Sequence, residues 1–510
     1  MTIAETKFIE RFLSKHAIQR CLDAGRPLHH SIRETPMKSL LCILLLAITH
    51  AEATAEDVFT SAEIEAIQSF LDERGGGNSA IVVGIVDSQG SHALCAGSLD
   101  NGTGTPVNGD TVFFIGSVTK TFTALALLEM AERGELQVHD PVAKYLSAKV
   151  KAPSYSGKQI TLLDLATHTS GLPFNPSNMT GADGREEYET YTTEKMHVFL
   201  EEYKLPRGPG TEFEYSNLGM AVLGEALSRR AGTDYESLII ERVCRPLGMT
   251  STGVTLKPEW QSRLAMGHDE SGKQSPPYRL EAYQPAGGLF STASDLLKYA
   301  AAQAGLTQSS LATPIAQSHV FRHVDIRGLP GQQFPIFGRT AMDWVDRNAI
   351  QPTGMELLGH AGGAGSYHAW IGFDKRQQRG VVVLTTDNDV STEAMGWTVL
   401  QRLPLTVASA KDFARELVGI GAALDVDPSM RMLRITQVMA NSPASQAGLL
   451  PGTLIQTING VSTVDKSASE CANLIRGPVG TRVRLDLTNS EGDETKSVEL
   501  VRAKFATSPG

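Results

Sequence analysis

Strand patterns stand at the two ends of a long helical stretch in this 510-residue chain. Two β-rich runs at 80–86 and 92–97, with a polar turn between them, predict an early hairpin. Strand patterns return only at 368–373 and 380–385, after a stretch at 140–310 in which Gly, Pro and Asn loops separate helices. The early hairpin needs the late strands as partners, which predicts one mixed α/β domain whose sheet joins distant parts of the sequence.

Helical periodicity predicts further elements beside this sheet. The first helix has an apolar side, and the second begins with a serine and stops at Gly134. The predicted helices that matter for the argument span 60–74, 117–134, 221–230 and 392–403.

A second domain is expected after the first. The pattern changes at 403–411, and about 95 residues of short strands and Gly/Pro turns follow. A length of 510 residues also exceeds that of one ordinary domain. The net charge of −10, without a long Lys/Arg run, gives a nucleic-acid surface no electrostatic support. We therefore expect the first domain to bind a small-molecule or peptide substrate and not a nucleic acid.

A short apolar run near the N-terminus has the composition of a targeting segment. A basic start at 37–38 opens the apolar run at 40–48, and Ala-Thr-Ala follows at 53–55. This order predicts a signal peptide at 37–55, export to the periplasm or exterior, and translation that starts after the polar extension at 1–36. The run is shorter than the roughly 20 apolar residues that span a bilayer, so no stable membrane span is expected. The alternative is a cytoplasmic protein with one buried helix here.

The sequence predicts neither a cofactor nor a metal site. The Gly-rich stretches at 75–77 and 362–365 each lead into a strand, whereas a phosphate-binding loop must open a helix. The chain has no H-E-x-x-H sequence, and its five cysteines are scattered without a C-x-x-C pair.

The strongest chemical signal is a Ser-x-x-Lys sequence at the start of the second predicted helix. Ser117 and Lys120 are three residues apart, so they share a helix face and the amine can lie beside the hydroxyl. The helix N-terminus also favours negative charge at the serine. A serine needs a neighbouring base to become a nucleophile, and a desolvated lysine can act as one.

Two further sequences offer polar groups to the same cleft. Tyr215 and Asn217 stand two apart before the helix predicted at 221–230, where Tyr215 could relay a proton and Asn217 could hold a substrate carbonyl and Lys120. The alternative is a turn that only caps this helix. The glycines of the sequence at 360–363 let the backbone approach a ligand closely, and an exposed N–H there could serve an oxyanion hole.

Three short sequences of this chain are Ser117-Val-Thr-Lys120, Tyr215-Ser-Asn217 and His360-Ala-Gly362. In order and spacing they resemble the three motifs of class C beta-lactamases and related penicillin-binding proteins. The resemblance covers residues 56–405. It implies an α/β (α+β) fold of beta-lactamase type, in which an antiparallel sheet is flanked by helices and joined to an all-helical region. Supporting stretches lie at 168–173, 246–249 and 285–295.

The resemblance also implies roles for individual residues. Ser117 resembles the nucleophile and Lys120 its activating partner. Tyr215 looks like the general base for acylation and the acid that protonates the leaving group. Asn217 matches the substrate amide contact, and the backbone N–H groups of Ser117 and Gly363 match the oxyanion hole.

The third motif departs from the family pattern. Most beta-lactamases of this group have Lys-Thr-Gly where this chain has His360, Ala361 and Gly362. A histidine that is neutral at pH 7 holds a substrate carboxylate less well than a lysine does. Histidine here is similar to some D-Ala-D-Ala carboxypeptidases and many esterase-like members, so efficient beta-lactamase activity is not expected. The His168 loop looks architectural in this family.

The C-terminal residues 413–505 resemble a PDZ domain, after a linker at 406–412. PDZ domains add a peptide as an extra strand and bind its C-terminal carboxylate on a glycine loop. By position, the resemblance places that loop at 419–422 and implies a protein C-terminus as partner. Asn459-Gly460 is a tight-turn signal in its own right. The alternative is a module that only packs on the hydrolase. The loop residues are Gly419, Ile420, Gly421 and Ala422.

The sequence therefore predicts an exported serine hydrolase that forms an acyl-enzyme on Ser117. Its expected substrates are D-amino-acid peptides, beta-lactams or esters. The alternative is a non-catalytic protein of the same fold that binds cell-wall fragments or peptides.

Overall fold

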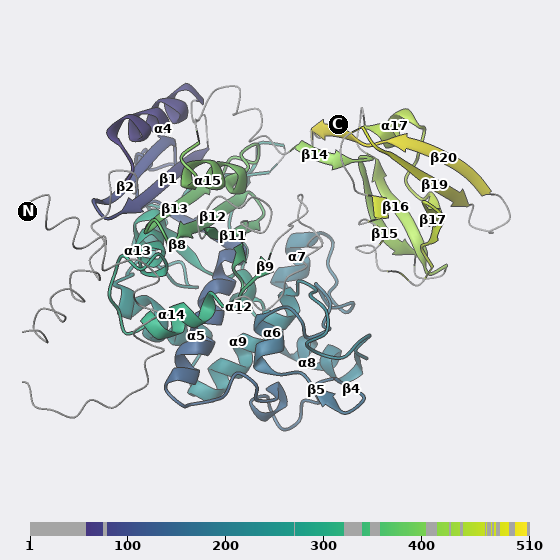
Figure 1. Cartoon of the computed structure of the whole chain (residues 1–510), viewed down its shortest axis with the longest axis horizontal. Coiled ribbons are helices and arrows are strands. Elements are labelled where there is room, and N and C mark those ends of the chain that lie inside the picture. The colour runs from purple at the N-terminus through teal and green to yellow at the C-terminus, as the bar shows by residue number, and fades with distance from the viewer. Residues whose placement is uncertain are drawn as a thin grey trace, which may run out of the picture. The chain divides into compact units, whose positions relative to one another are not determined.

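The computed structural model in Figure 1 describes most of the chain from residue 58 onward. The predicted extension at 1–36, signal peptide at 37–55 and linker at 406–412 lie outside the described residues. The described residues are 58–74, 79–269, 271–320, 339–346, 357–403, 416–427, 430–438, 442–464, 466, 471, 474–475, 480–488 and 495–506.

Within the described residues, the larger domain is built on a seven-stranded sheet of order β2-β1-β13-β12-β11-β10-β9. Every neighbouring pair is antiparallel, and Val83 of β1 lies opposite Val383 of β13. The early hairpin thus pairs with the late strands, as predicted. The strands are β1 (Ala80–Asp87), β2 (Gly90–Gly97), β9 (Arg339–Thr340), β10 (Val345–Asp346), β11 (Leu357–Ala364), β12 (Tyr367–Asp374) and β13 (Arg379–Thr385).

Helices cover both faces of this sheet, which explains why β1 is buried along its whole length. Val83 and its face pack with α4 (Ser61–Arg74) and α15 (Thr392–Leu400) in one hydrophobic cluster. Val82, on the opposite face by the two-residue alternation of a strand, belongs to the cluster of the helical region. Strands buried on both faces read as continuous apolar runs rather than as alternating ones.

The helical region surrounds α5 (Thr119–Glu132), which is buried from Thr119 to Met130. The predicted helix at 117–134 is confirmed, except that its first turn is the 3₁₀ turn η1 (Gly116–Val118). No described helix is both long and apolar enough to cross a membrane. The other helices are α6 (Leu162–Ala166), α7 (Gly184–Glu189), α8 (Thr193–Glu202), α9 (Asn217–Ala231), α10 (Tyr235–Ile239), α11 (Pro258–Gln261), α12 (Gln284–Gly287), α13 (Ala293–Gln303) and α14 (Ala312–Ser318).

Short elements complete this domain. The 3₁₀ turns η2 (Val142–Lys144) and η4 (Arg245–Leu247) and the π turn η3 (Ile240–Cys244) connect helices. Three two-stranded sheets pair β3 (Val112–Phe114) with β8 (Phe290–Thr292), β4 (Ser154–Tyr155) with β5 (Lys158–Gln159), and β6 (Gly267–His268) with β7 (Gln274–Ser275).

Helix α9 begins four residues before the predicted start at 221. Ser216 adopts an extended backbone and its Oγ accepts a hydrogen bond from the Gly219 N–H at 2.8 Å. A serine at this position stabilises the otherwise unpaired donors of a first turn. Asn217 is therefore the first residue of a helix, and Tyr215 stands just outside it.

The C-terminal domain is mainly β and has its own hydrophobic core, which includes Leu433, Ile455 and Leu485. Asn459 and Gly460 form the predicted tight turn, with φ of 50° and 81°. Its elements are β14 (Glu416–Gly419), β15 (Ala422–Asp427), β16 (Met432–Val438), α17 (Pro443–Gln446), β17 (Leu454–Ile458), β18 (Val461–Ser462), β19 (Arg482–Thr488), β20 (Thr495–Val501) and β21 (Ala503–Ala506).

Candidate active site

Ser117 lies in η1, where the backbone of strand β11 packs directly against it. Gly116 has φ +50°, and a Cβ there would lie 2.8 Å from the Gly363 nitrogen. A Cβ on Gly362 would lie 2.1 Å from the Ile115 carbonyl oxygen and 3.0 Å from the Ser117 nitrogen. Glycine is therefore required where these two segments meet. As expected, the sequence at 362–365 precedes a strand, β12, and its residues up to Ala364 also form the end of β11, which was not predicted.

Lys120 lies one turn further along and is fully buried. Its Nζ donates hydrogen bonds to Ser117 Oγ at 2.9 Å and to the Ala286 carbonyl oxygen at 2.5 Å. Burial lowers the pKa of Lys120 to about 7, and the negative charge of Asp343 opposes this shift. A substantial fraction of Lys120 is therefore neutral near pH 7, so this amine can accept the proton of Ser117.

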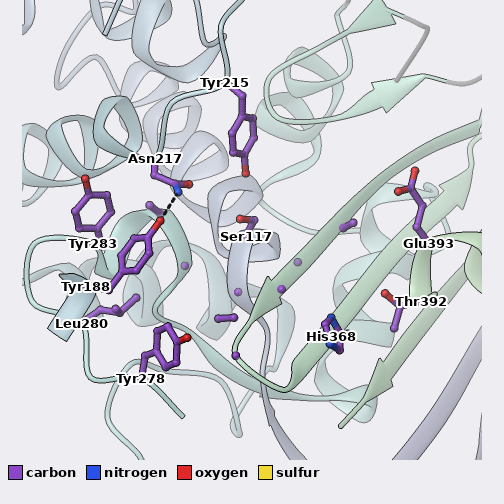
Figure 2. A pocket seen from close by; sticks show the side chains of 18 of the residues that line it. Ser117, Tyr188, Tyr215, Asn217, Tyr278, Leu280, Tyr283, His368, Thr392 and Glu393 are labelled. Carbon is purple, nitrogen blue, oxygen red and sulfur yellow. Dashed lines mark hydrogen bonds between the residues drawn. The ribbon is translucent and has the colours of Figure 1, made fainter. Parts of the chain in front are cut away.

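Tyr215 stands over this pair. Its ring centroid is 4.9 Å from Lys120 Nζ, and its hydroxyl points toward Ser117 in Figure 2. The hydroxyl is buried, and no group of the described residues meets hydrogen-bond geometry with it. Burial raises the pKa of Tyr215 well above its usual range, which the Ser117 hydroxyl opposes only in part. Tyr215 is therefore a neutral phenol at neutral pH and can donate a proton.

Asn217 faces the same pocket from the start of α9. Its Nδ2 donates to the hydroxyl of Tyr188 at 3.1 Å, a bond drawn in Figure 2. Tyr188 also accepts from Asn175 at 2.8 Å. Tyr188 lies on α7, within the stretch 174–193, where the sequence shows no motif.

His360 is placed differently from the other predicted residues. It is buried, and Ala361 and Gly363 beside it line the pocket whereas it does not. Its Nδ1–H donates to the carbonyl oxygen of Ala361 at 2.7 Å. Burial lowers the pKa of His360 to about 4, so the ring is neutral at pH 7. His360 therefore brings no positive charge to a bound ligand at neutral pH.

The pocket around Ser117 has a volume of about 440 Å³. In Figure 2, aromatic side chains lie on one side of Ser117 and a polar group of residues on the other. The aromatic side ends in rings of Tyr188 and Tyr283 whose centroids are 5.3 Å apart. The aromatic side includes Tyr188, Tyr278 and Tyr283, and the polar side includes His368, Thr392 and Glu393.

A buried hydrogen-bonded pair that the sequence did not predict lies next to Tyr215. His168 Nε2 and Asp343 Oδ1 are 2.8 Å apart, and both side chains are almost fully buried. The His168 ring centroid is 4.3 Å from that of Tyr215. Asp343 lies between two very short strands, in a stretch without any sequence motif.

Comparison with known proteins identifies the larger domain. The sequence profile of the beta-lactamase family matches residues 65–403, which is more than half of the chain. The chain belongs to the beta-lactamase family. This confirms the predicted family and its class of enzyme, the serine hydrolases. The profile of PDZ domains matches residues 434–489, so the family member carries a C-terminal PDZ domain, also as predicted.

Relatives of this beta-lactamase-family chain include two kinds of enzyme. The D-alanyl-D-alanine-carboxypeptidase/endopeptidase AmpH of Escherichia coli K12 is 31% identical over 270 residues, which cover 52% of this chain and 68% of that protein. A beta-lactamase of Pseudomonas fluorescens is 26% identical over 313 residues, 56% of this chain and 83% of that protein.

Solved structures agree on the fold of this family member. A beta-lactamase/D-alanine carboxypeptidase from Yersinia pestis complexed with citrate matches with a TM-score of 0.56 at 24% identity. The match covers 67% of this chain and 98% of the Yersinia pestis chain. The beta-lactamase-like fold predicted from the sequence is thereby confirmed.

In the PDZ domain of this family member, the predicted peptide-binding loop joins β14 to β15. Ile420 is buried in the domain core, and its carbonyl oxygen accepts from the Ala444 N–H at 2.7 Å. Gly421 has φ +71°, and a Cβ there would lie 2.1 Å from the Ser442 side chain. Gly419 and Ala422 are the adjoining ends of the two strands. Strand β15 lies at an edge of its sheet within the described residues.

Proposed function

We propose that this chain cleaves its substrate through an acyl-enzyme on Ser117. The observation that carries this proposal is the 2.9 Å hydrogen bond between Ser117 Oγ and a buried Lys120 whose pKa is about 7, at the floor of a pocket. A nucleophile within hydrogen-bond reach of a base of suitable pKa is what acyl transfer requires.

The proposed reaction begins when neutral Lys120 takes the proton of Ser117. Ser117 Oγ then attacks the substrate carbonyl, and the backbone N–H groups of Ser117 and Gly363 donate to the oxyanion. Tyr215 passes its proton to the leaving group, and the proton held by Lys120 restores the phenol. Water then attacks the acyl-enzyme and gives its proton to Lys120. Tyr215 protonates Ser117 Oγ as the acyl group leaves. In this proposal the Asn217 amide donates to an amide or ester carbonyl of the substrate.

The proposed substrates are D-amino-acid peptides of the D-Ala-D-Ala type or esters, ahead of beta-lactams. The Escherichia coli relative is named as a D-alanyl-D-alanine-carboxypeptidase, which supports D-Ala-D-Ala peptides as substrates. The neutral His360 does not line the pocket, so it cannot replace a lysine that binds a substrate carboxylate. Losing such a charge-assisted hydrogen bond costs on the order of 1.5–3 kcal/mol, about ten- to a hundredfold in binding.

We further propose that the protein is exported and that its PDZ domain binds a protein C-terminus. The apolar run at 40–48, with the sequence around it, supports a signal peptide at 37–55. The tight loop at Gly421 and the edge strand β15 support addition of a peptide strand.

The proposed nucleophile is tested by intact mass of the mature protein, cut at about residue 56, after incubation with a penicillin. We expect a lasting adduct that Ser117→Ala removes. An adduct that persists in Ser117→Ala would exclude Ser117 as the nucleophile. If neither penicillin nor simple esters react, the non-catalytic alternative would replace the acyl-enzyme proposal.

A further inference from the structure

The buried pair of His168 and Asp343 lies outside the pocket and is not used in the steps above. His168 is 3% exposed and Asp343 is 4% exposed, and they come from the loop after α6 and from the turn between β9 and β10. The turn is held by hydrogen bonds from the Ala341 N–H to the Trp344 carbonyl oxygen and from the Met342 N–H to the Ser318 carbonyl oxygen. A carboxylate this deep is costly to bury.

The hydrogen bonds of His168 fix which of its nitrogens carries the proton. The Ser216 backbone N–H lies 3.1 Å from His168 Nδ1, and a backbone N–H can only donate. Nδ1 is therefore the acceptor, and Nε2–H donates to Asp343 Oδ1 at 2.8 Å. One imidazole thus connects a buried carboxylate to the segment that carries Tyr215, Ser216 and Asn217.

The charge of Asp343 also acts directly on the proposed catalytic residues. Its second oxygen, Oδ2, is buried and has no hydrogen-bond partner among the described residues. The negative charge raises the pKa of Lys120 against the effect of burial, and adds to the effect of burial at Tyr215. The titratable groups that interact with Asp343 are Lys120, His168, Tyr215, Tyr299 and His360.

We propose that His168 and Asp343 are positioning residues for the reaction at Ser117: Asp343 orients the His168 ring and supplies a buried negative charge to the site, and His168 holds the Tyr215–Asn217 segment. This inference rests on the proposed function. Without Asp343, Lys120 loses its proton at lower pH. Without the hydrogen bonds of His168, the phenol of Tyr215 is no longer held over Ser117.

The role of Asp343 is tested by the rate at which a fluorophosphonate labels Ser117, followed by intact mass across pH. In this step the Oγ–P bond forms, the P–F bond breaks, fluoride leaves, and Lys120 takes the proton. Asp343→Asn keeps an oxygen that can accept from His168 but removes the charge. In the plot of labelling rate against pH, we expect the rising limb to move to lower pH by about one unit, because Lys120 loses one nearby opposite charge. An unmoved limb would overturn the inference.

Two substitutions of His168 separate hydrogen bonding from ring packing. His168→Gln keeps one donor and one acceptor, whereas His168→Phe keeps a ring and loses both hydrogen bonds. We expect labelling to slow at least about tenfold in His168→Phe, and much less in His168→Gln. Equal rates in both variants would overturn the positioning role.

These outcomes can be told apart from failure of the proposed function. If the unsubstituted protein is not labelled, or Ser117→Ala is labelled equally, the nucleophile is wrong and the positioning inference fails with it. If the unsubstituted protein is labelled on Ser117 but the limb of Asp343→Asn is unchanged, only the inference fails. Circular dichroism of each variant verifies folding. If Asp343→Asn does not fold, the comparison of His168→Gln with His168→Phe still tests the inference.

Discussion

At the scale of single residues, Lys120 experiences two opposing effects. Burial favours the neutral amine, while the charge of Asp343 favours the ammonium form. The result is a pKa of about 7 in place of the ordinary value of 10.5. Since the folded protein releases this proton at a lower pH than the unfolded chain does, Lys120 also connects catalysis with stability.

Lys120 should make the free energy of unfolding rise with pH above about 7. Between pH 7 and 10.5 the unfolded chain binds one more proton at Lys120 than the folded protein, so deprotonation favours folding as the pH increases. Lys120→Met should remove this rise, which amounts to about 2–3 kcal/mol over two pH units. Urea unfolding of both proteins at about pH 7 and about pH 9 measures the difference. Parallel behaviour of the two proteins would contradict the lowered pKa.

Residues that share a local pattern were predictable, and residues brought in from a distance were not. Helix spacing predicted that Ser117 and Lys120 share a face, and the resemblance assigned roles to both and to Tyr215, Asn217 and Gly363. Asp343 reaches the site because β9 and β10 join the edge of the sheet beside β11, and two-residue strands leave no periodic signal. Tyr188 lies on α7, a short helix whose position depends on tertiary contacts.

At the scale of elements, β11 was not predicted, because its glycines weaken the strand signal. No element was predicted for residues 359–363, yet all of them pair with β12. The absence of side chains at Gly362 lets this strand approach Ser117 backbone to backbone. The same glycine that obscures the element in the sequence thus permits the geometry of the site.

Gly362→Ala should therefore disturb the site more than the fold. The new Cβ would stand 2.1 Å from the Ile115 carbonyl oxygen, so β11 or η1 must move. A displacement of about 1 Å can lower a reaction rate about a hundredfold, and we expect Ser117 labelling to slow on this scale. Gly184→Ala, where a Cβ meets nothing within 4 Å, is the matched control and should label normally. Normal labelling of Gly362→Ala would show that close approach of these strands is unnecessary.

At the scale of the whole molecule, the two domains differ in how far apart in sequence their contacting residues lie. The hydrolase domain joins distant segments, whereas the PDZ domain is formed by one continuous stretch of sequence. The pairing of β1 with β13 means that the hydrolase sheet is complete only when residues about 300 positions apart meet. Among the described residues, those of the PDZ core all lie between Ile420 and Leu500. Separate cores predict separate unfolding transitions.

Ile455→Ala tests this separation in the full-length protein. Ile455 is fully buried in the PDZ core, so the truncation should cost that domain about 2–5 kcal/mol. We expect the PDZ transition to move to lower temperature, while the hydrolase transition and the rate of Ser117 labelling stay unchanged. Val501→Ala, at a site 49% exposed in β20, is the control and should change stability by less than about 0.5 kcal/mol. Because Ile115 and Val118, on either side of Ser117, belong to a core that excludes Ile455, slower labelling in Ile455→Ala would mean that the PDZ domain supports the active site.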